Sequence, residues 1–532
     1  MGFLKVQGYA KKTELIIGKT LLEHLRSLDV DINASCGGLG ECKQCLVQVN
    51  DSSLLGSLTD SEREFIREPG YRLACQARVV SDNQDLFVVV PERTFTILPT
   101  GKRKNIVLDP CVKRISLHGN TVYWRNKEIG IYEGALMGLA LDIGTTTLSM
   151  YCTDLETGKD ILVVSRENPQ IKYGNDVISR ITYANNNGQE PLEKEIRNAV
   201  NGMIQNLPVD PHKIYEAVIV GNPTMRDLFF GLPVKGLGEA PYNPHMKTSV
   251  YKQAKELRLN INPNATVYGM PLISGFIGAD CISVVLATNL HREAGLNIAI
   301  DIGTNTEIVF GNKDRMIATS CASGPAFEGV GIKWGVAGVG GAIKNVSIDQ
   351  DLVVEYETIG DLPPIGICGS GLIDVLANLL DREIIDWRGR FTEERNSFVI
   401  VDRDNPITIS EEDIDKLKLA KAAISLGVKT LIKINGSKLG DVDTIFLAGG
   451  FGNFIDVENA IKIGLLPNID IQKIERVGNA ALEGAREALL SDPKRKDVDY
   501  IAKNTEHKSL ESIPDFSYEY MKELSFEEYK KI

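Results

Sequence analysis

Near its start the sequence reads Ala34-Ser-Cys36-Gly-Gly-Leu-Gly-Glu-Cys42-Lys-Gln-Cys45, and a fourth cysteine follows in Leu73-Ala-Cys75-Gln-Ala. Five residues separate Cys36 from Cys42, and two separate Cys42 from Cys45. Three thiolates on a glycine-rich loop with a distant fourth are typical of a [2Fe–2S] cluster, and the plant-type spacing of four and two residues is a near variant. The loop glycines allow sharp turns and direct amide N–H groups toward sulfur. The pattern predicts a cluster held by Cys36, Cys42, Cys45 and Cys75.

Two other interpretations of these cysteines fit less well. A structural zinc site favours paired spacings of two to four residues, and only Cys42 and Cys45 form such a pair. A disulfide framework requires an oxidising compartment, and nothing in the sequence indicates export. The five remaining cysteines are expected to be small buried hydrophobes: Cys111, Cys152, Cys281, Cys321 and Cys368.

The charge balance of the chain is acidic. Its 532 residues include 59 lysines and arginines against 71 aspartates and glutamates, a net charge of −12. This balance argues against nonspecific binding to nucleic acid or to anionic membranes, so we expect neither as a partner. The amino terminus lacks the apolar core of a signal peptide, and Asp280 interrupts the apolar stretch 271–290. We therefore expect the chain to act in the cytoplasm.

Residues 1–93 predict a compact β-rich domain. The expected order is strands at 3–9 and 13–17, a helix at 21–28, the cysteine loop, and strands at 46–49 and 85–90. This is the order of the β-grasp fold of [2Fe–2S] ferredoxins. Proline and basic residues then mark a linker, and a hairpin with strands at 114–117 and 121–124 follows, so 94–135 is assigned as linker and small β segment.

An internal duplication begins the larger part of the chain. Ala140-Leu-Asp-Ile-Gly-Thr-Thr-Thr-Leu148 recurs as Ala299-Ile-Asp-Ile-Gly-Thr-Asn-Thr-Glu307, and each copy is an apolar strand that runs into an aspartate and a glycine turn. Two similar α/β lobes that face each other across a cleft are the simplest architecture for residues 136–492. In the charged stretch 493–532, we expect a helix near 513–521 to dock on the second lobe.

The two repeated turns suit phosphate. Glycine removes the Cβ that would block close approach, and exposed amides and hydroxyls can donate to phosphate oxygens. The aspartate before each turn, Asp142 or Asp301, can hold Mg²⁺ directly or through water. The candidate phosphate-binding residues are Gly144, Thr145, Thr146 and Thr147 in the first copy, and Gly303, Thr304, Asn305 and Thr306 in the second.

A third glycine cluster follows the apolar strand at 445–448. Gly449, Gly450 and Gly452 leave room for a flat adenosine to lie against backbone. Close packing between a strand and a helix also selects glycine and is the alternative explanation. The order of the three clusters favours the nucleotide interpretation.

These three motifs resemble those of the actin, sugar-kinase and Hsp70 ATPase superfamily. The resemblance implies two RNase H-like lobes with Mg·ATP between them and lobe closure coupled to nucleotide state. Leu272-Ile-Ser-Gly-Phe-Ile-Gly-Ala-Asp280 looks like the segment that brings an aspartate base to the second phosphate loop in sugar kinases. By that resemblance Asp280 is the candidate general base. The alternative is that Asp280 only caps the helix that follows it.

A [2Fe–2S] ferredoxin domain joined to such an ATPase resembles the reductive activators of corrinoid-dependent methyltransferases. The stretches from Val220 to Phe229, Ala322 to Gly329 and Gly369 to Asp374 also look like that family. The resemblance implies ATP-dependent transfer of one electron from the cluster to the Co(II) corrinoid of a partner protein, which restores Co(I). It also implies a low-potential electron donor such as a ferredoxin or flavodoxin.

Two rival functions remain open. The chain could be a redox-regulated small-molecule kinase in which Asp280 activates a substrate hydroxyl. It could also be a non-catalytic scaffold in which ATP gates a ferredoxin domain. Phosphorylation of a metabolite favours the first rival, and negligible ATP turnover with any partner favours the second.

Overall fold

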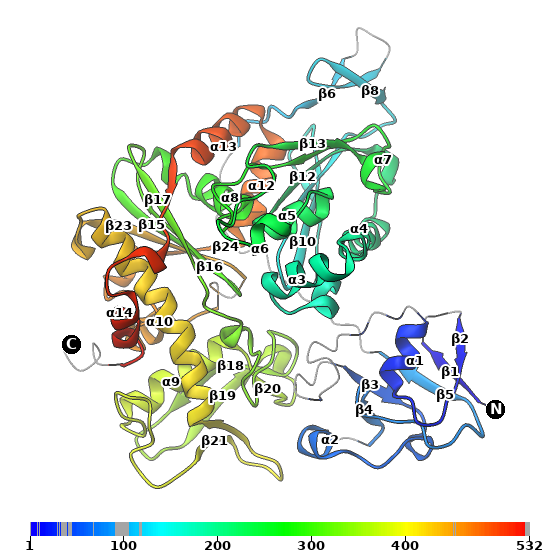
Figure 1. Cartoon of the computed structure of the whole chain (residues 1–532), viewed down its shortest axis with the longest axis vertical. Coiled ribbons are helices and arrows are strands. Elements are labelled where there is room, and N and C mark those ends of the chain that lie inside the picture. Colours follow the sequence, from blue (N-terminus) through cyan, green and yellow to red (C-terminus); the bar gives the residue numbers. More distant parts are fainter. Residues whose placement is uncertain are drawn as a thin grey trace. The chain divides into compact units, whose positions relative to one another are not determined.

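The computed structural model describes residues 2–7, 9, 11–28, 30, 32, 40, 45–66, 69–90, 106–115, 120–450, 452 and 454–526. By its internal contacts the chain divides into two compact units. The first consists of residues 1–94 with 169–175, and the second of residues 95–168 with 176–532. Figure 1 labels the helices and strands of both.

The first unit is built on a five-stranded sheet. Its strand order is β2 (Lys12–Glu14), β1 (Phe3–Val6), β5 (Leu86–Val89), β3 (Leu46–Val49) and β4 (Tyr71–Leu73). The inner strands β1 and β5 are parallel, whereas β3 runs antiparallel to both β4 and β5. With helix α1 (Leu21–Ser27), which begins after a capping box at Thr20, this is the β-grasp fold that the sequence predicts.

Two elements of this unit were not predicted. They are β4 and the short helix α2 (Asp60–Phe65), which begins after a capping box at Thr59. The core that the sheet and α1 share is aliphatic, and its fully buried members include Leu4, Leu21, Leu25, Val47, Leu73 and Leu86.

The small β segment is a three-stranded antiparallel sheet rather than a hairpin. Its strands are β6 (Val112–Ile115), β7 (Thr121–Trp124) and β8 (Lys127–Ile131), and residues 116–119 lie outside the described residues. It packs on the duplicated region, where the hydroxyl of Tyr215 donates to the carbonyl of Ile131 at 2.7 Å. The third strand, β8, was not predicted.

The first lobe contains a six-stranded sheet. Its order is β11 (Asp160–Glu167), β10 (Thr147–Asp154), β9 (Met137–Ile143), β12 (Ile214–Gly221), β14 (Thr266–Gly269) and β13 (Val250–Gln253). Strands β9, β10 and β11 are antiparallel neighbours, and β9, β12 and β14 are parallel. Helices α3 (Val177–Asn187), α4 (Glu190–Gln205), α5 (Pro223–Phe230), α6 (Lys235–Gly238), α7 (Ala254–Leu257) and α8 (Ala279–Thr288) complete the lobe.

The second lobe repeats this topology. Strands β15 (Leu296–Ile302), β16 (Thr306–Gly311) and β17 (Met316–Cys321) are antiparallel, and β15, β23 (Val442–Ala448) and β24 (Ile474–Gly478) are parallel. Strand β25 (Thr505–His507) adds to the edge beside β17. The duplication in the sequence is therefore a duplication of the fold, and β9 and β15 are equivalent central strands.

Further elements of the second lobe surround its sheet. The long helix α10 (Glu411–Ile434) packs on β16 and β17, and α9 (Gly369–Asp381) packs on β18. The others are α11 (Val457–Lys462), β18 (Ala342–Ile348), β19 (Val354–Thr358), β20 (Gly366–Ile367), β21 (Ser397–Val401) and β22 (Ile407–Ser410).

The end of the chain crosses between the lobes. After β24, helix α12 (Ala480–Leu490) returns to the first lobe and packs on α8, β9 and β12, and α13 (Asp492–Asn504) packs on α8 and α12. Helix α14 (Phe516–Glu523) then lies on α10, where Lys429 pairs with Glu523 at 2.8 Å. The two lobes are thus tied together by three crossings of the chain instead of one (Figure 1).

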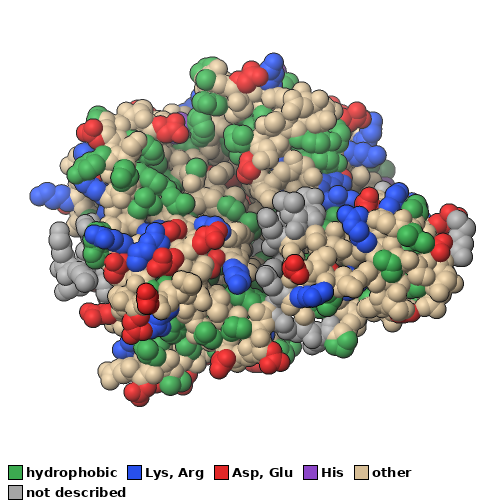
Figure 2. Space-filling model, turned by 60° about the horizontal axis from the view of Figure 1, so that its bottom comes forward, with side chains coloured by type: hydrophobic (Ala, Val, Ile, Leu, Met, Phe, Trp, Pro, Cys, Tyr) green, Lys and Arg blue, Asp and Glu red, His purple; other side chains and the backbone are tan. Residues whose placement is uncertain are grey.

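The surface carries charges of both signs. On the face drawn in Figure 2, lysine and arginine side chains lie among aspartate and glutamate side chains, with hydrophobic side chains scattered between them. Within the part of the chain that the structure describes, no helix has the length and apolar run needed to span a bilayer.

A buried ion pair joins three elements of the second unit. Nη2 of Arg495 on α13 lies 2.8 Å from Oε1 of Glu216 on β12, and the indole N–H of Trp124 on β7 donates to the same oxygen at 2.6 Å. Glu216 is fully buried and Arg495 is 3% exposed. We expect Arg495→Ala to destabilise the second unit by about 3–5 kcal/mol, because it leaves an unpaired buried carboxylate. Chemical denaturation measures this loss.

The matched control lies beside the same helix. Arg292 pairs with Asp497 of α13 at 2.7 Å, but its side chain is 61% exposed. Arg292→Ala should cost no more than about 1 kcal/mol, since exposed ion pairs contribute little. Equal losses for the two variants would show that the buried pair does not anchor α13.

Candidate functional site

The first candidate site lies in the first unit, around the predicted cluster cysteines. Cys45 immediately precedes β3 and is 1% exposed, and Cys75 follows β4 and is 6% exposed. The structure brings these two together: the backbone N–H of Cys75 donates to Sγ of Cys45 at 3.4 Å. Cys36 and Cys42 lie outside the described residues.

Hydrogen bonds to sulfur favour the thiolate form of Cys75. Besides its contact with Cys45, its Sγ accepts a bond from Nε2 of Gln76 at 3.6 Å, and the backbone of Gly40 also hydrogen-bonds to it. These bonds, led by the one with Cys45, lower the pKa of Cys75 to about 6 against the effect of burial. Thiolates stabilised by N–H donors are the ligands that an iron–sulfur cluster requires, so the described residues fit it.

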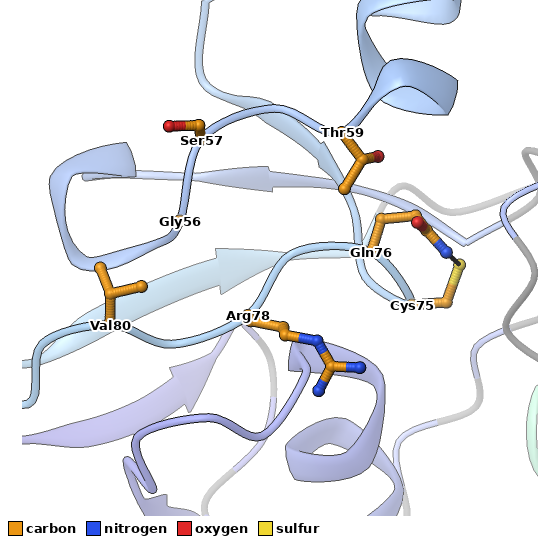
Figure 3. Close-up of a pocket in the computed structure, with 7 residues that line it drawn as sticks. All are labelled: Gly56, Ser57, Thr59, Cys75, Gln76, Arg78 and Val80. Atoms are coloured by element: carbon orange, nitrogen blue, oxygen red, sulfur yellow. Dashed lines mark hydrogen bonds between the residues drawn. The ribbon is translucent and has the colours of Figure 1, made fainter.

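The surface is hollowed next to Cys75. A cavity of about 320 Å³ is lined by Gly56, Ser57, Thr59, Cys75, Gln76, Arg78 and Val80. In Figure 3 the amide of Gln76 points at the sulfur of Cys75, and Thr59, Ser57, Arg78 and Val80 surround the hollow. One predicted ligand, Cys75, therefore lines an open hollow on the surface of the unit.

A buried ion pair supports the turn that carries Cys75. Arg72 of β4 donates through Nε and Nη2 to the two carboxylate oxygens of Glu62 on α2, at 2.8 and 3.0 Å. The backbone N–H of Leu73 donates to the same carboxylate at 3.0 Å. Because Glu62 is fully buried and Arg72 is 2% exposed, this pair fixes β4 two residues before Cys75. Sequence reasoning missed it because α2 was not predicted.

The second candidate site lies at the two repeated turns of the second unit. Residues 144–146 join β9 to β10, and residues 303–305 join β15 to β16, so the two turns occupy equivalent ends of the two sheets. At Gly144, an added Cβ would lie 2.7 Å from the carbonyl oxygen of Thr147. The hairpin itself therefore requires glycine there, a reason that the phosphate interpretation did not include.

Side chains of the first lobe hold the first turn in place. Asn168 donates a hydrogen bond to the carbonyl of Gly144 at 2.8 Å, and Arg180 donates one to the carbonyl of Thr145 at 2.7 Å. Asn222 donates to the hydroxyl of Thr145 at 3.0 Å. Arg180 is fully buried. The turn is thus rigidly presented, and the hydroxyl of Thr145 faces its own lobe.

The second turn is held in a similar way. The hydroxyl of Thr306, which is fully buried, lies 2.9 Å from the hydroxyl of Ser323, and Ser323 donates to the carbonyl of Gly303 at 3.3 Å. The hydroxyl of Thr306 therefore bonds within its own lobe, as the hydroxyl of Thr145 does in the first lobe. Thr147 and Asn305 are both half-buried.

The third glycine cluster lies against the second turn. Gly449 has a φ of +95°, and a Cβ there would lie 2.5 Å from the carbonyl oxygen of Ile302 and 3.0 Å from Oδ1 of Asp301. Close packing against the end of β15 thus requires glycine at this position, whereas the alternative explanation was packing between a strand and a helix. Gly450 has open space around its Cα, whereas a Cβ at Gly452 would meet the carbonyl oxygen of Ala448 at 2.7 Å.

Carboxylates from both lobes converge between the turns. Burial and the Asp280 carboxylate raise the pKa of Asp142 to about 7, although Asn479 donates to it at 3.1 Å. Burial, then Asp280 and Asp142, raise the pKa of Asp301 to about 8. Burial raises the pKa of Asp280 to about 6. The three predicted acidic residues therefore lie close enough to repel one another.

A fourth carboxylate, Glu307, was missed by the sequence analysis. It lies directly opposite Asp301 in the β15–β16 pairing, where the first copy pairs Asp142 with Ser149. Burial, Asp280 and Asp301 raise its pKa well above the ordinary value. A glutamate in an otherwise apolar strand was the available signal.

Asp280 lies in the first turn of α8 and is not the residue that caps it. The helix begins after Gly278, and the carboxylate of Asp280 accepts the neighbouring N–H of Cys281 at 2.8 Å. The capping interpretation is therefore wrong. The carboxylate is half-buried and interacts with Asp142, Asp301 and Glu307.

The two turns meet at a single point. Oγ1 of Thr146 lies 3.2 Å from Oγ1 of Thr304, and the carboxylate of Glu328 accepts from both hydroxyls, at 3.2 Å from Thr146 and 2.9 Å from Thr304. Glu328 belongs to the stretch Ala322 to Gly329, and sequence analysis gave it no role. The structure therefore brings together one predicted threonine from each turn.

This arrangement suits a magnesium nucleotide. Mg²⁺ takes oxygen ligands and neutralises carboxylates that otherwise repel one another, which matches the raised pKa values. Hydroxyls and backbone amides at the ends of two hairpins can donate to phosphate oxygens.

The cluster site can be tested apart from the second unit. Cys75→Ser should abolish the visible absorbance of a reconstituted [2Fe–2S] cluster and leave nucleotide binding intact, because the two units have separate hydrophobic cores. Cys111→Ser, a change at a buried cysteine of the second unit, is the control and should keep the spectrum. Loss of nucleotide binding in Cys75→Ser would contradict the independence of the units.

The carboxylates predict how stability depends on pH. Asp142 and Asp301 bind a proton more tightly in the folded chain than at their ordinary pKa of 3.8, so their contribution to stability is lost as the pH rises toward about 7 and 8. Without divalent cations, the melting temperature should fall as the pH rises from about 4 to about 8, and Mg²⁺ should restore it at the upper end of this range. Asp301→Asn should flatten this dependence. A wild-type melting temperature that is independent of pH and of Mg²⁺ would contradict the inference that Asp142 and Asp301 lie buried and close to other carboxylates.

Comparison with known proteins covers nearly the whole chain. Three family models match: "2Fe-2S iron-sulfur cluster binding domain" over residues 4–80, "RACo middle region" over 137–293, and "C-terminal domain of RACo the ASKHA domain" over 295–531. The middle-region model thus covers the first lobe from β9 to α8, and the ASKHA model covers the second lobe together with α12 and α13. They support the predicted ferredoxin domain and the actin-like, sugar-kinase-like architecture.

Individual relatives agree with these matches. The chain is 32% identical to the corrinoid activation enzyme RamQ of Eubacterium limosum, over 94% of this chain and 95% of the relative. It is 27% identical to the [Co(II) methylated amine-specific corrinoid protein] reductase of Methanosarcina barkeri, over 74% and 77% of the two chains. A solved structure, described as a reductive activator for corrinoid,iron-sulfur protein, matches with a TM-score of 0.73 and 33% identity, over 99% of this chain and 98% of that one. The chain belongs to the family of corrinoid-protein reductive activators.

Proposed function

We propose that the protein uses ATP to return one electron to the Co(II) corrinoid of a methyltransferase corrinoid protein, and so restores Co(I). The observation that supports this most directly is the presence of two kinds of site in one chain. The first unit holds a pair of cysteines under N–H···S bonds, and the second holds equivalent Asp–Gly–Thr turns with converging carboxylates. The relatives whose names state corrinoid activation or reduction share this organisation over most of their length.

Several of the predicted residues have a task in this proposal. Cys36, Cys42, Cys45 and Cys75 would hold a [2Fe–2S] cluster, which supplies the transferable electron. Asp142 and Asp301 would hold Mg²⁺, and Thr146 and Thr304 would donate to phosphate oxygens. Asp280 would orient a water molecule toward the terminal phosphate, and the glycines that would leave room for adenosine are Gly449, Gly450 and Gly452.

ATP is needed because the electron transfer is uphill. Plant-type clusters have reduction potentials of about −400 mV, and Co(II) corrinoids are harder to reduce than such clusters. For a one-electron couple, each ~59 mV of mismatch disfavours the product tenfold. Docking on the partner could raise the acceptor potential by changing the axial ligation of cobalt, and lobe movement could then separate the proteins before back-transfer.

The partners follow from the same scheme. The acceptor is a corrinoid protein, and the donor that reduces the cluster is a low-potential protein such as a ferredoxin or flavodoxin. We expect the reaction to take place in the cytoplasm, without nucleic acid or membrane.

Anaerobic spectroscopy tests the proposal. Reconstituted protein, reductant and candidate corrinoid proteins should give the Co(I) absorbance only when ATP is added, and the corrinoid protein should stimulate phosphate release. A phosphorylated metabolite in place of free phosphate would support the kinase alternative, which the carboxylate of Asp280 between the turns favours. Negligible turnover with every partner would support a scaffold.

A change at the second turn should separate Mg·ATP binding from reduction of the cluster. Asp301→Ala should weaken Mg·ATP binding and stop Co(I) formation, because it removes a ligand from one lobe. The cluster should stay reducible, since it belongs to the other unit. Normal Co(I) formation in Asp301→Ala would reject the assignment of the second turn to Mg·ATP.

A further inference from the structure

Glu328 connects the two lobes through a single carboxylate. One oxygen accepts from Thr304 of the second lobe at 2.9 Å, and the other accepts from Thr146 of the first lobe at 3.2 Å. The two hydroxyls also lie 3.2 Å apart. A phosphate group between the turns would make the same kind of bridge, with two acceptor oxygens on one centre.

The two bridges cannot exist together, because each hydroxyl has one proton to donate. When the protons of Thr146 and Thr304 point at Glu328, neither can be donated to a phosphate oxygen. A carboxylate and a phosphate in the same place would also repel each other strongly at this half-buried position. A nucleotide phosphate that uses these donors must therefore displace the Glu328 side chain.

The backbone around Glu328 is anchored in the second lobe. Glu328 ends the short helix η6 (Ala326–Glu328), whose residues Ala326 and Phe327 are buried in the hydrophobic core of this lobe. The helix η6 packs against α9 and α10. Displacement should therefore move the side chain of Glu328 and break its bond to Thr146 of the other lobe, while η6 stays in place.

We propose that Glu328 is a latch that bridges the two turns and that a nucleotide phosphate must open. This inference rests on the proposed function, since it requires nucleotide to bind between the turns. It deepens that function by making Glu328 a positioning residue that lowers nucleotide affinity and ties phosphate binding to release of one lobe from the other. Binding of phosphate then exchanges a bridge within the protein for a bridge through the ligand.

The test measures nucleotide affinity and hairpin protection in purified full-length variants. Glu328→Ala removes the competing acceptor, so it should bind Mg·ADP and Mg·ATP about tenfold more tightly than the wild type. Glu328→Gln keeps the size but removes the charge, so its affinity should rise by a smaller factor. Without nucleotide, amide hydrogens of residues 143–147 should exchange faster in Glu328→Ala. Glu293→Ala, a loss of one exposed carboxylate, is the control and should change neither readout.

The outcomes separate this inference from the proposed function. If the wild type binds nucleotide but Glu328→Ala and Glu328→Gln bind it equally well or more weakly, the latch is rejected and the proposed function stands. If the wild type binds no nucleotide, the proposed function fails. Unchanged amide exchange of residues 143–147 in Glu328→Ala would reject the Glu328 bridge between the turns, whatever the nucleotide affinities are. If Glu328→Ala does not fold, Glu328→Gln decides by the same two readouts.

Discussion

Repulsion among carboxylates at the meeting point of the two lobes is the constraint on which the second unit depends. The duplicated topology places an aspartate at the same end of each central strand, and the cross-strand neighbour of Asp301 is a further carboxylate, Glu307. Asp280 of α8 adds to this charge, and burial together with the neighbouring carboxylates raises the pKa values of Asp142 and Asp301. A fold that brings these groups together is favoured when a cation shares them, so a magnesium nucleotide bound at this point would stabilise the folded second unit.

The first unit is organised around a different requirement, which is to hold negative sulfur in a buried turn. Backbone and side-chain N–H groups point at the sulfur atoms of Cys45 and Cys75, and the Glu62–Arg72 pair fixes the strand that leads to Cys75. An open hollow beside Cys75 leaves this edge accessible from the surface. The chain thus combines a unit suited to storing an electron with a unit suited to changing shape when nucleotide binds, which is the combination that an uphill one-electron transfer requires.

Much of this organisation could be predicted from local sequence. The cysteine spacing predicted the β-grasp unit, because few folds place three thiolates on a glycine-rich loop. The repeated Asp–Gly–Thr segments predicted two equivalent lobes, because strand, turn and hydroxyls lie within nine residues of each other. The strand at 46–49 was also placed correctly, because its pattern is contained within its own four residues.

What could not be predicted depends on contacts between distant residues. Helix α12 returns to the first lobe although it follows a strand of the second, and nothing in its own sequence indicates which sheet it covers. Glu216 and Arg495 are 279 positions apart, and Glu328 reaches Thr146 across 182 positions. The alternative interpretation of Asp280 as a helix cap was wrong for a local reason, because α8 begins at Ala279, one residue before Asp280, with Gly278 at the cap position.

A single-turnover experiment tests the coupling between the two units most directly. The protein is reduced, freed of excess reductant, and mixed anaerobically with a Co(II) corrinoid protein in a stopped-flow spectrometer, with and without Mg·ATP. Coupling predicts that cluster reoxidation and Co(I) appearance occur together, at a stoichiometry of about one, and only when Mg·ATP is present. The same yield of Co(I) without nucleotide would contradict it.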